Sequence, residues 1–265
     1  MSCPFPGRRR RRAMRKLMLL AALVAPMAQA ESLEVAAHSM LRLPNKAASV
    51  HLQHLRVADS GTLLLPASLS ELKIDRLELG RDARIAVAPA EGALSIAVAH
   101  ASQGEGSEIS APGAPGTYER SARPGRNLEL RLAELEADRL AIDARGGAGA
   151  PGYFGLDGAN GKSGGCTWGQ ASRGANGDDG GNGHDGASGG RVRLAVPDSF
   201  PRERIVVRLD GGAPGKPGAA GRAGVGGASK GCLVYSTDAG ANGRPGREGQ
   251  PGLAGASGEL IIQRL

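Results

Sequence analysis

Glycine recurs at every third position in four runs of the second half of this chain. The runs cover residues 146–164, 174–189, 212–227 and 240–258. A spacing of three is typical of the left-handed polyproline II helix, whose three residues per turn leave one edge of the segment without side chains. Glycine at that edge permits a close backbone neighbour. We therefore expect the second half to consist of extended segments that pack against one another.

Cysteine-containing breaks and short apolar stretches interrupt the runs. Cys166 lies between the first two runs and Cys232 between the last two. Alternating apolar residues predict strands at 139–144, 191–196, 204–210 and 259–265. A chain that leaves a strand and later returns to one has to reverse direction, and we place each reversal at a cysteine break. This predicts two antiparallel polyproline II hairpins on a four-stranded base, whose middle strands are joined at 197–201 by a hairpin connection.

Residues 31–144 are predicted to form a β-rich domain, followed by the hairpins in residues 145–265. Apolar and polar residues alternate in short bursts with turns between them. Residues 55–66 and 77–87 are weakly similar at an offset of about 22 residues, which suits a β-solenoid. A β-sandwich accounts for the same strands. The expected fold class is all-β: a strand base, solenoid-like or sandwich, with an antiparallel bundle of glycine-rich polyproline II hairpins.

The glycine runs resemble those of known proteins. Pro245 and Pro251 occupy the third position of Gly-x-y triplets, so residues 240–258 are similar to bacterial collagen-like repeat proteins. Phased glycines with paired cysteines more specifically resemble the polyproline II bundles of a springtail antifreeze protein and of some phage tail-tip adhesins. The resemblance covers residues 146–258 and implies a local conformation. No family residue carries over beyond the glycines and the paired cysteines.

The first thirty residues have the layout of a secretory signal peptide. The arginines from Arg8 to Arg12 precede an apolar run at 17–25 and the small residues Ala28 and Ala30. The true start is either Met1 or Met14. We expect an exported protein that is periplasmic, at the cell surface or extracellular. The apolar run is too short for a membrane anchor, and no transmembrane segment is expected after it.

The net charge of the chain belongs to this leader. The sequence holds 33 Lys and Arg against 26 Asp and Glu, a formal charge of +7. Residues 1–30 contain seven of those bases and no acid, and 33 − 7 leaves 26 bases against 26 acids. A balanced chain has no electrostatic footprint for nucleic acid, so we expect no nucleic-acid partner.

Two cysteines remain after the leader, which contains Cys3. An even pair in an exported chain favours a disulfide between Cys166 and Cys232. Because the two residues occupy matching positions in the two breaks, their bond would join the far ends of the hairpins. Metal ligation and two free thiols are the alternatives, although neither cysteine has the close second cysteine of a zinc motif.

Residues 180–188 match the calcium-binding nonapeptide pattern once. Sites of that kind need tandem copies, and the glycine spacing alone explains the same residues without calcium. Asp178, Asp179 and Asp185 are the weak calcium candidates. We expect no cofactor.

No motif supports catalysis, so we expect a protein that is not an enzyme. The four histidines of the first half show no motif spacing to a nucleophile: His38, His51, His54 and His100. The aromatic residues are candidate contacts at an exposed tip, or they pack over the disulfide. These residues are Trp168, Tyr235, Tyr153 and Phe154.

The expected function is structural or adhesive. Rigid hairpins would hold the disulfide-linked loops away from the base, where they contact a surface, a glycan or a protein partner. The oligomeric state is left open between a monomer and a homo-oligomer. A calcium-stabilised extracellular module and an ice-binding protein are the alternative functions.

Overall fold

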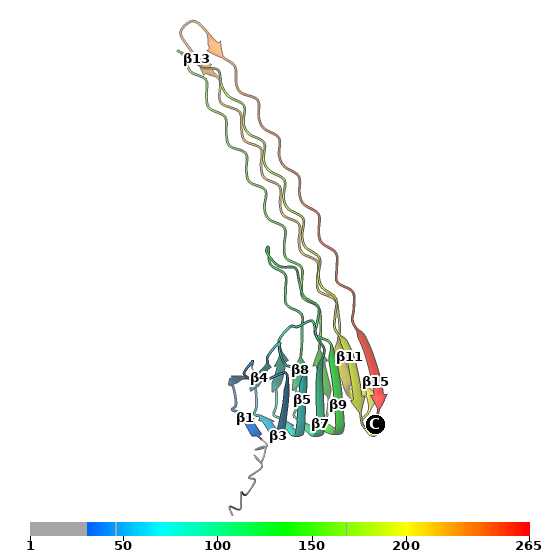
Figure 1. Ribbon diagram of the computed structural model, residues 1–265. Coiled ribbons are helices and arrows are strands. Elements are labelled where there is room, and N and C mark those ends of the chain that lie inside the picture. Colours follow the sequence, from blue (N-terminus) through cyan, green and yellow to red (C-terminus); the bar gives the residue numbers. More distant parts are fainter. Residues whose placement is uncertain (1–30, 46, 168) are drawn as a thin grey trace, which may run out of the picture.

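The apolar strands of the chain pair in parallel and belong to two sheets. The structure is a computed structural model that describes residues 31–45, 47–167 and 169–265, so the predicted signal peptide lies outside it. One sheet has seven strands in the order β1-β3-β5-β7-β9-β11-β15, and the other has six in the order β12-β10-β8-β6-β4-β2. All pairings within these two sheets are parallel. Each coil of the chain thus contributes one strand to each sheet (Figure 1).

The strands are short and mostly separated by turns. The seven-stranded sheet comprises β1 (Glu31–Val35), β3 (Ser49–Val57), β5 (Glu71–Leu79), β7 (Leu94–Gln103), β9 (Leu128–Ala137), β11 (Arg191–Val196) and β15 (Glu259–Arg264). The six-stranded sheet comprises β2 (Met40–Arg42), β4 (Thr62–Leu65), β6 (Arg84–Val87), β8 (Glu108–Ser110), β10 (Leu140–Asp143) and β12 (Ile205–Arg208). A 3-10 turn, η1 (Arg202–Arg204), precedes β12, and the small strands β13 (Lys230–Gly231) and β14 (Ser236–Thr237) form a separate pair.

Alternation along the strands places one set of apolar side chains between the two sheets. Four of these residues, Leu55, Leu77, Ile85 and Leu194, are completely buried there, and Leu130 is nearly so. Phe200, in the connection from β11 to β12, is also buried against this core. The core is therefore aliphatic and continuous across the coils.

The predicted fold class is wrong. Residues 139–144, 191–196, 204–210 and 259–265 were expected to form one base sheet that carries antiparallel hairpins. Instead, β10 and β12 belong to one all-parallel sheet, and β11 and β15 belong to the other. The connection at 197–201 is no hairpin, because it leads from one sheet to the opposite sheet. An alternating pattern fixes which face of a strand is apolar, but it does not fix the neighbour with which the strand pairs.

The coils lengthen along the chain because long segments are inserted between their strands. Ser49 pairs with Glu71, an offset of 71 − 49 = 22 residues. Leu94 pairs with Leu128, an offset of 34, and Leu128 pairs with Val192, an offset of 64. The glycine runs account for the largest offsets. They are insertions into coils whose strands still stack in register.

We call the four inserted runs the stalk and number them segments 1 to 4: residues 146–164, 174–189, 212–227 and 240–258. They contain no helix or sheet strand and project together from one end of the two sheets, with β13 and β14 at the far end (Figure 1). Segments 1 and 3 follow β10 and β12, whereas segments 2 and 4 lead into β11 and β15.

Glycine amides hold the stalk together. Gly152 of segment 1 donates to the Lys216 carbonyl of segment 3 at 2.8 Å, and Gly180 of segment 2 donates to the Arg247 carbonyl of segment 4 at 2.8 Å. Gly218 of segment 3 in turn donates to the carbonyl of Gly181 of segment 2 at 2.9 Å. The same bonds recur at every third residue along all four segments, and both partners always belong to this one chain.

Stalk glycines leave no space for a side chain. A Cβ atom built on Gly180 would lie closer than 3.0 Å to the Gly218 carbonyl oxygen, and one on Gly246 would lie equally close to the Asp178 carbonyl oxygen. The obstacle in both cases is backbone, which is itself fixed by hydrogen bonds. The spacing of three is thus a steric requirement of the packed segments.

Asp143 and Arg126 stabilise the end of the sheets from which the stalk projects. Asp143, at the end of β10, accepts hydrogen bonds from the Arg145 guanidinium at 2.8 Å and lies 3.5 Å from Arg208. Burial raises the pKa of Asp143, but the bonds from Arg145 outweigh it and leave that pKa below its ordinary value. Arg126 is 1% exposed and donates to the carbonyls of Pro66, Ala88 and Gly92 at 3.1 to 3.4 Å, fixing the loops of that end.

Substitution of a stalk glycine tests this packing. We expect Gly180→Ala to destabilise the protein by about 2 kcal/mol or more, because the added methyl group meets fixed backbone. Gly92→Ala is the matched control, since a Cβ there meets nothing within 4 Å. Thermal unfolding followed by circular dichroism measures both. Equal melting temperatures for the two variants would contradict the proposed steric requirement.

Candidate contact site at the stalk tip

The far end of the stalk is a small, covalently joined structure, which we call the tip (residues 162–167, 169–173 and 227–240). β13 and β14 pair antiparallel, with Lys230 opposite Thr237 and Gly231 opposite Ser236. The Cys232 amide donates to the Tyr235 carbonyl at 2.7 Å and closes the turn between the strands. Leu233 and Val234 occupy that turn.

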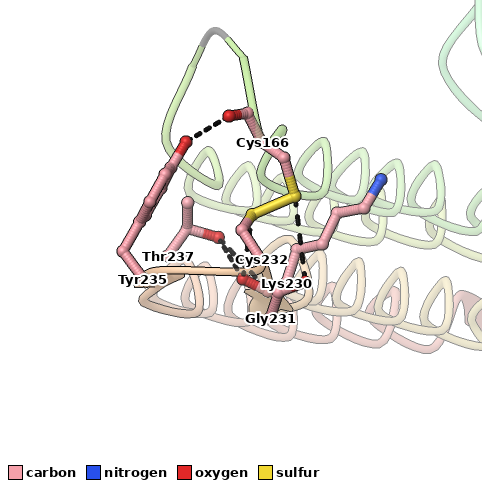
Figure 2. Close-up of a disulfide and its surroundings, with 6 residues drawn as sticks. All are labelled: Cys166, Lys230, Gly231, Cys232, Tyr235 and Thr237. Carbon is pink, nitrogen blue, oxygen red and sulfur yellow. Dashed lines mark hydrogen bonds between the residues drawn. A yellow bond between two sulfur atoms is a disulfide. The ribbon is translucent and has the colours of Figure 1, made fainter.

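A disulfide between Cys166 and Cys232 joins the two loops of the tip (Figure 2). The structure thus contains the disulfide predicted from the even cysteine pair. The bond links residues 66 apart in sequence, and the loop-closure model gives on the order of 4 kcal/mol for a loop of that length. The Tyr235 hydroxyl also donates to the Cys166 carbonyl, so the tyrosine crosses from one loop to the other.

Three consecutive apolar or aromatic residues are exposed beside this disulfide. Leu233 is 105% exposed, Val234 94% and Tyr235 52%. Single exposed apolar residues are normal on a protein surface, whereas a contiguous exposed group is less common and is therefore a candidate contact site. Leu233 and Val234 were missed at the sequence level, although the apolar triplet that follows Cys232 is the signal that could have identified them.

Among the aromatic residues predicted as contacts at the tip, those that the structure describes lie in different places. Tyr235 lies at the tip, and Trp168 lies outside the described residues. Tyr153 and Phe154 lie on segment 1 nearer the sheets, where the Tyr153 carbonyl accepts from the Gly181 amide at 2.8 Å. Both are exposed, at 65% and 72%. The structure therefore does not bring Tyr153 and Phe154 together with the disulfide.

Asparagine and aspartate side chains form a ladder along the stalk. Four residues of segment 2 each accept, through Oδ1, from a backbone amide of segment 4 at 2.6 to 2.8 Å: Asn176, Asp179, Asn182 and Asp185 bond to Arg244, Arg247, Gln250 and Leu253. Asp157 and Asn160 of segment 1 do the same for Arg222 and Val225 of segment 3. The recurring Gly-x-Asn or Gly-x-Asp triplet is the signal for this ladder.

The ladder gives two of the calcium candidates another role. The Oδ1 atoms of Asp179 and Asp185 accept from backbone amides at 2.6 and 2.7 Å, and the backbone of Asp178 bonds to segments 1 and 3. Among the residues that the structure describes, no group of three or more His, Cys, Asp or Glu is placed to hold a metal ion.

Three histidines lie on the outer face of the seven-stranded sheet, each beside a carboxylate of the next strand. His51 is 2.9 Å from Asp75, His54 is 3.3 Å from Glu78 and His100 is 2.7 Å from Glu134. The first and third pairs are more than half exposed, and exposed ion pairs contribute little to stability. Sequence reasoning took these histidines as scattered, whereas the stacked coils bring them to one face.

Comparison with known proteins finds no match: no family model, no curated protein and no solved structure is similar to this chain. The resemblance to collagen-like Gly-x-y proteins and to polyproline II bundles is therefore wrong as a statement of kinship. The likeness to collagen also fails in its physical basis. In this protein the glycine amides bond within one chain, and the strands of that chain form parallel sheets. In the described ranges, no helix is long and apolar enough to cross a membrane.

The ladder predicts a local effect of a single substitution. Asn182→Ala removes the acceptor of the Gln250 amide, and a hydrogen bond of this kind contributes about 1 kcal/mol. We expect amide exchange at Gln250 to become about five-fold faster, as measured by NMR. Asn182→Asp keeps the acceptor and is the matched control. The Leu253 amide, bound to Asp185, serves as an internal reference that should not change.

Calcium removal is expected to have no effect on stability, because Oδ1 of Asp179 and Oδ1 of Asp185 each already accept a backbone amide of segment 4. A calcium ion present at one hundred times its Kd would add about 2.7 kcal/mol. Melting temperatures in calcium and in chelator should therefore coincide. A clear rise of the melting temperature with calcium would contradict the structural role of the ladder.

Proposed function

We propose that this chain is an exported, non-enzymatic structural or adhesive protein that presents the tip on a rigid stalk. The observation that carries the proposal is the position of the exposed group Leu233, Val234 and Tyr235, which lies beside a disulfide at the end of the stalk farthest from the sheets (Figure 1). The disulfide and the finding on helices in the described residues are compatible with export.

The stalk suits such a role because its shape is fixed by repeated bonds. Backbone bonds recur at every third residue, and the side-chain ladder adds acceptors for amides of segments 3 and 4. A preorganised contact loop loses less conformational entropy on binding than a free loop would. The Tyr235 bond to Cys166 and the disulfide restrict the tip in the same way.

The calcium-stabilised and ice-binding alternatives gain no such support. Two of the three carboxylates suspected of binding calcium, those of Asp179 and Asp185, accept backbone amides. Ice binding needs a flat face of small side chains, whereas charged residues recur along the stalk, among them the exposed Lys216, Arg244 and Arg247.

Adhesion of a tip variant tests the proposal. In the triple variant Leu233→Ser, Val234→Ser and Tyr235→Ser, we expect at least a ten-fold loss of binding, because burying one such side chain contributes about 1.5–3 kcal/mol. Protein immobilised on beads is measured against glycan arrays, protein-coated surfaces and lipid-coated surfaces.

Leu156→Ser is the matched control for the tip variant, because Leu156 is an equally apolar residue of the stalk and is 72% exposed. Circular dichroism verifies that both variants fold. If the folded triple variant adheres as well as the unchanged protein on every surface tested, the tip is not the contact site and the proposal is wrong.

A further inference from the structure

The exposed group at the tip is small, fully accessible and consecutive in sequence. Leu233 and Val234 lie at the turn between β13 and β14, and their side chains are almost completely exposed. A stable protein interface buries about 800 Å² on each partner and involves 20 to 30 residues. Three consecutive side chains provide only a fraction of that area. The size of the group thus argues against a protein partner.

A lipid bilayer imposes a different requirement. Only a few apolar side chains need to enter the boundary between headgroups and hydrocarbon. Backbone groups that enter lipid have to be satisfied internally. In the tip, the Cys232 amide donates to the Tyr235 carbonyl at 2.7 Å, and the Lys230 amide donates to Thr237 Oγ1 at 3.1 Å. Some backbone groups of the tip are therefore already satisfied within the protein, as a lipid environment requires.

The charges around the tip have the sign that an anionic membrane attracts. Lys162, Arg173 and Lys230 are exposed, and Asp238 is the single exposed acid of the tip, so that 3 − 1 gives a charge of +2. Within the described part of the chain, no carboxylate lies within 4.0 Å of these three bases. Figure 2 shows the Lys230 side chain extending away from the disulfide.

We propose that the tip binds an anionic lipid surface. Leu233 and Val234 enter the bilayer, Tyr235 lies at the level of the headgroups as tyrosines do in membrane proteins, and the three bases contact lipid phosphates or carboxylates. This inference rests on the proposed function, because it names the partner of the same tip. A glycan or a protein partner is the competing outcome of the test.

The experiment measures vesicle binding by the full chain, expressed with export so that the disulfide forms. The vesicles are phosphatidylcholine alone and phosphatidylcholine with phosphatidylserine, and bound protein is quantified by co-sedimentation. We expect binding to the phosphatidylserine vesicles and at least a ten-fold loss in the double variant Leu233→Ser and Val234→Ser. Lys230→Gln should reduce binding by about five-fold at low salt.

The controls separate the tip from the rest of the chain. Leu156→Ser should bind as the unchanged protein does, because Leu156 lies on the stalk. The arginines from Arg8 to Arg12 would themselves attract anionic vesicles, so intact mass is determined and only preparations with the same N-terminus are compared. Near-ultraviolet circular dichroism verifies that each variant retains its tip structure.

Two results would overturn the lipid proposal. Absence of binding to phosphatidylserine vesicles is one, and undiminished binding by the Leu233→Ser and Val234→Ser variant is the other. If, in addition, the triple tip variant loses binding to a glycan or protein surface, the proposed function stands and only the lipid partner is wrong. If the tip variants change no surface binding at all, both proposals fail together.

Discussion

The hydrogen bond from a glycine amide to the carbonyl of a neighbouring segment is the interaction on which the stalk depends. Gly152, Gly180 and Gly218 each make one, at distances of 2.8 to 2.9 Å, where no Cβ atom fits. Each bond contributes about 1 kcal/mol net, whereas ordering the backbone of one residue costs about 1 to 2 kcal/mol. The free energy of the backbone hydrogen bonds alone therefore leaves little margin over the entropy lost when the stalk is ordered. The side-chain ladder adds bonds to amides of segments 3 and 4, and the disulfide joins the two loops of the tip.

The parallel sheets explain why four segments arrive at one place. Segments 1 and 3 leave the ends of β10 and β12, and segments 2 and 4 enter the beginnings of β11 and β15. In each sheet, parallel strands begin at one end and finish at the other, so these four positions share one end of the molecule (Figure 1). Neighbouring strands lie about 4.8 Å apart. Because of that spacing, the segments lie close enough to one another to form backbone hydrogen bonds from their first residues.

Sequence reasoning identified features that are local and missed those that depend on pairing. The alternation at 191–196 and 259–265 marks real strands, but it contains no information on whether they join one sheet or two. The even cysteine pair sufficed for the disulfide, since only one pairing was available outside the leader. The spacing of three specifies an edge without side chains but not the number of chains that share it, and the inferred kinship therefore failed. Asp179 and Asp185 were only weak calcium candidates in the sequence, and their amide partners, Arg247 and Leu253, could not be identified there because they lie 68 residues away.

The same architecture prevents the tip from burying its own apolar residues. Segment 2 and its neighbours meet through glycine edges that carry no side chains, whereas Leu233 and Val234 lie beyond these edges, in the turn between β13 and β14. At about 3.1 Å per residue, segments of this length place the tip roughly 50 to 60 Å from the end of the sheets, whose aliphatic core includes Leu55 and Leu194. The disulfide holds the turn beside the loop that contains Cys166, so that the turn does not fold back along the stalk. Exposure of this group is thus a consequence of its place at the end of the stalk.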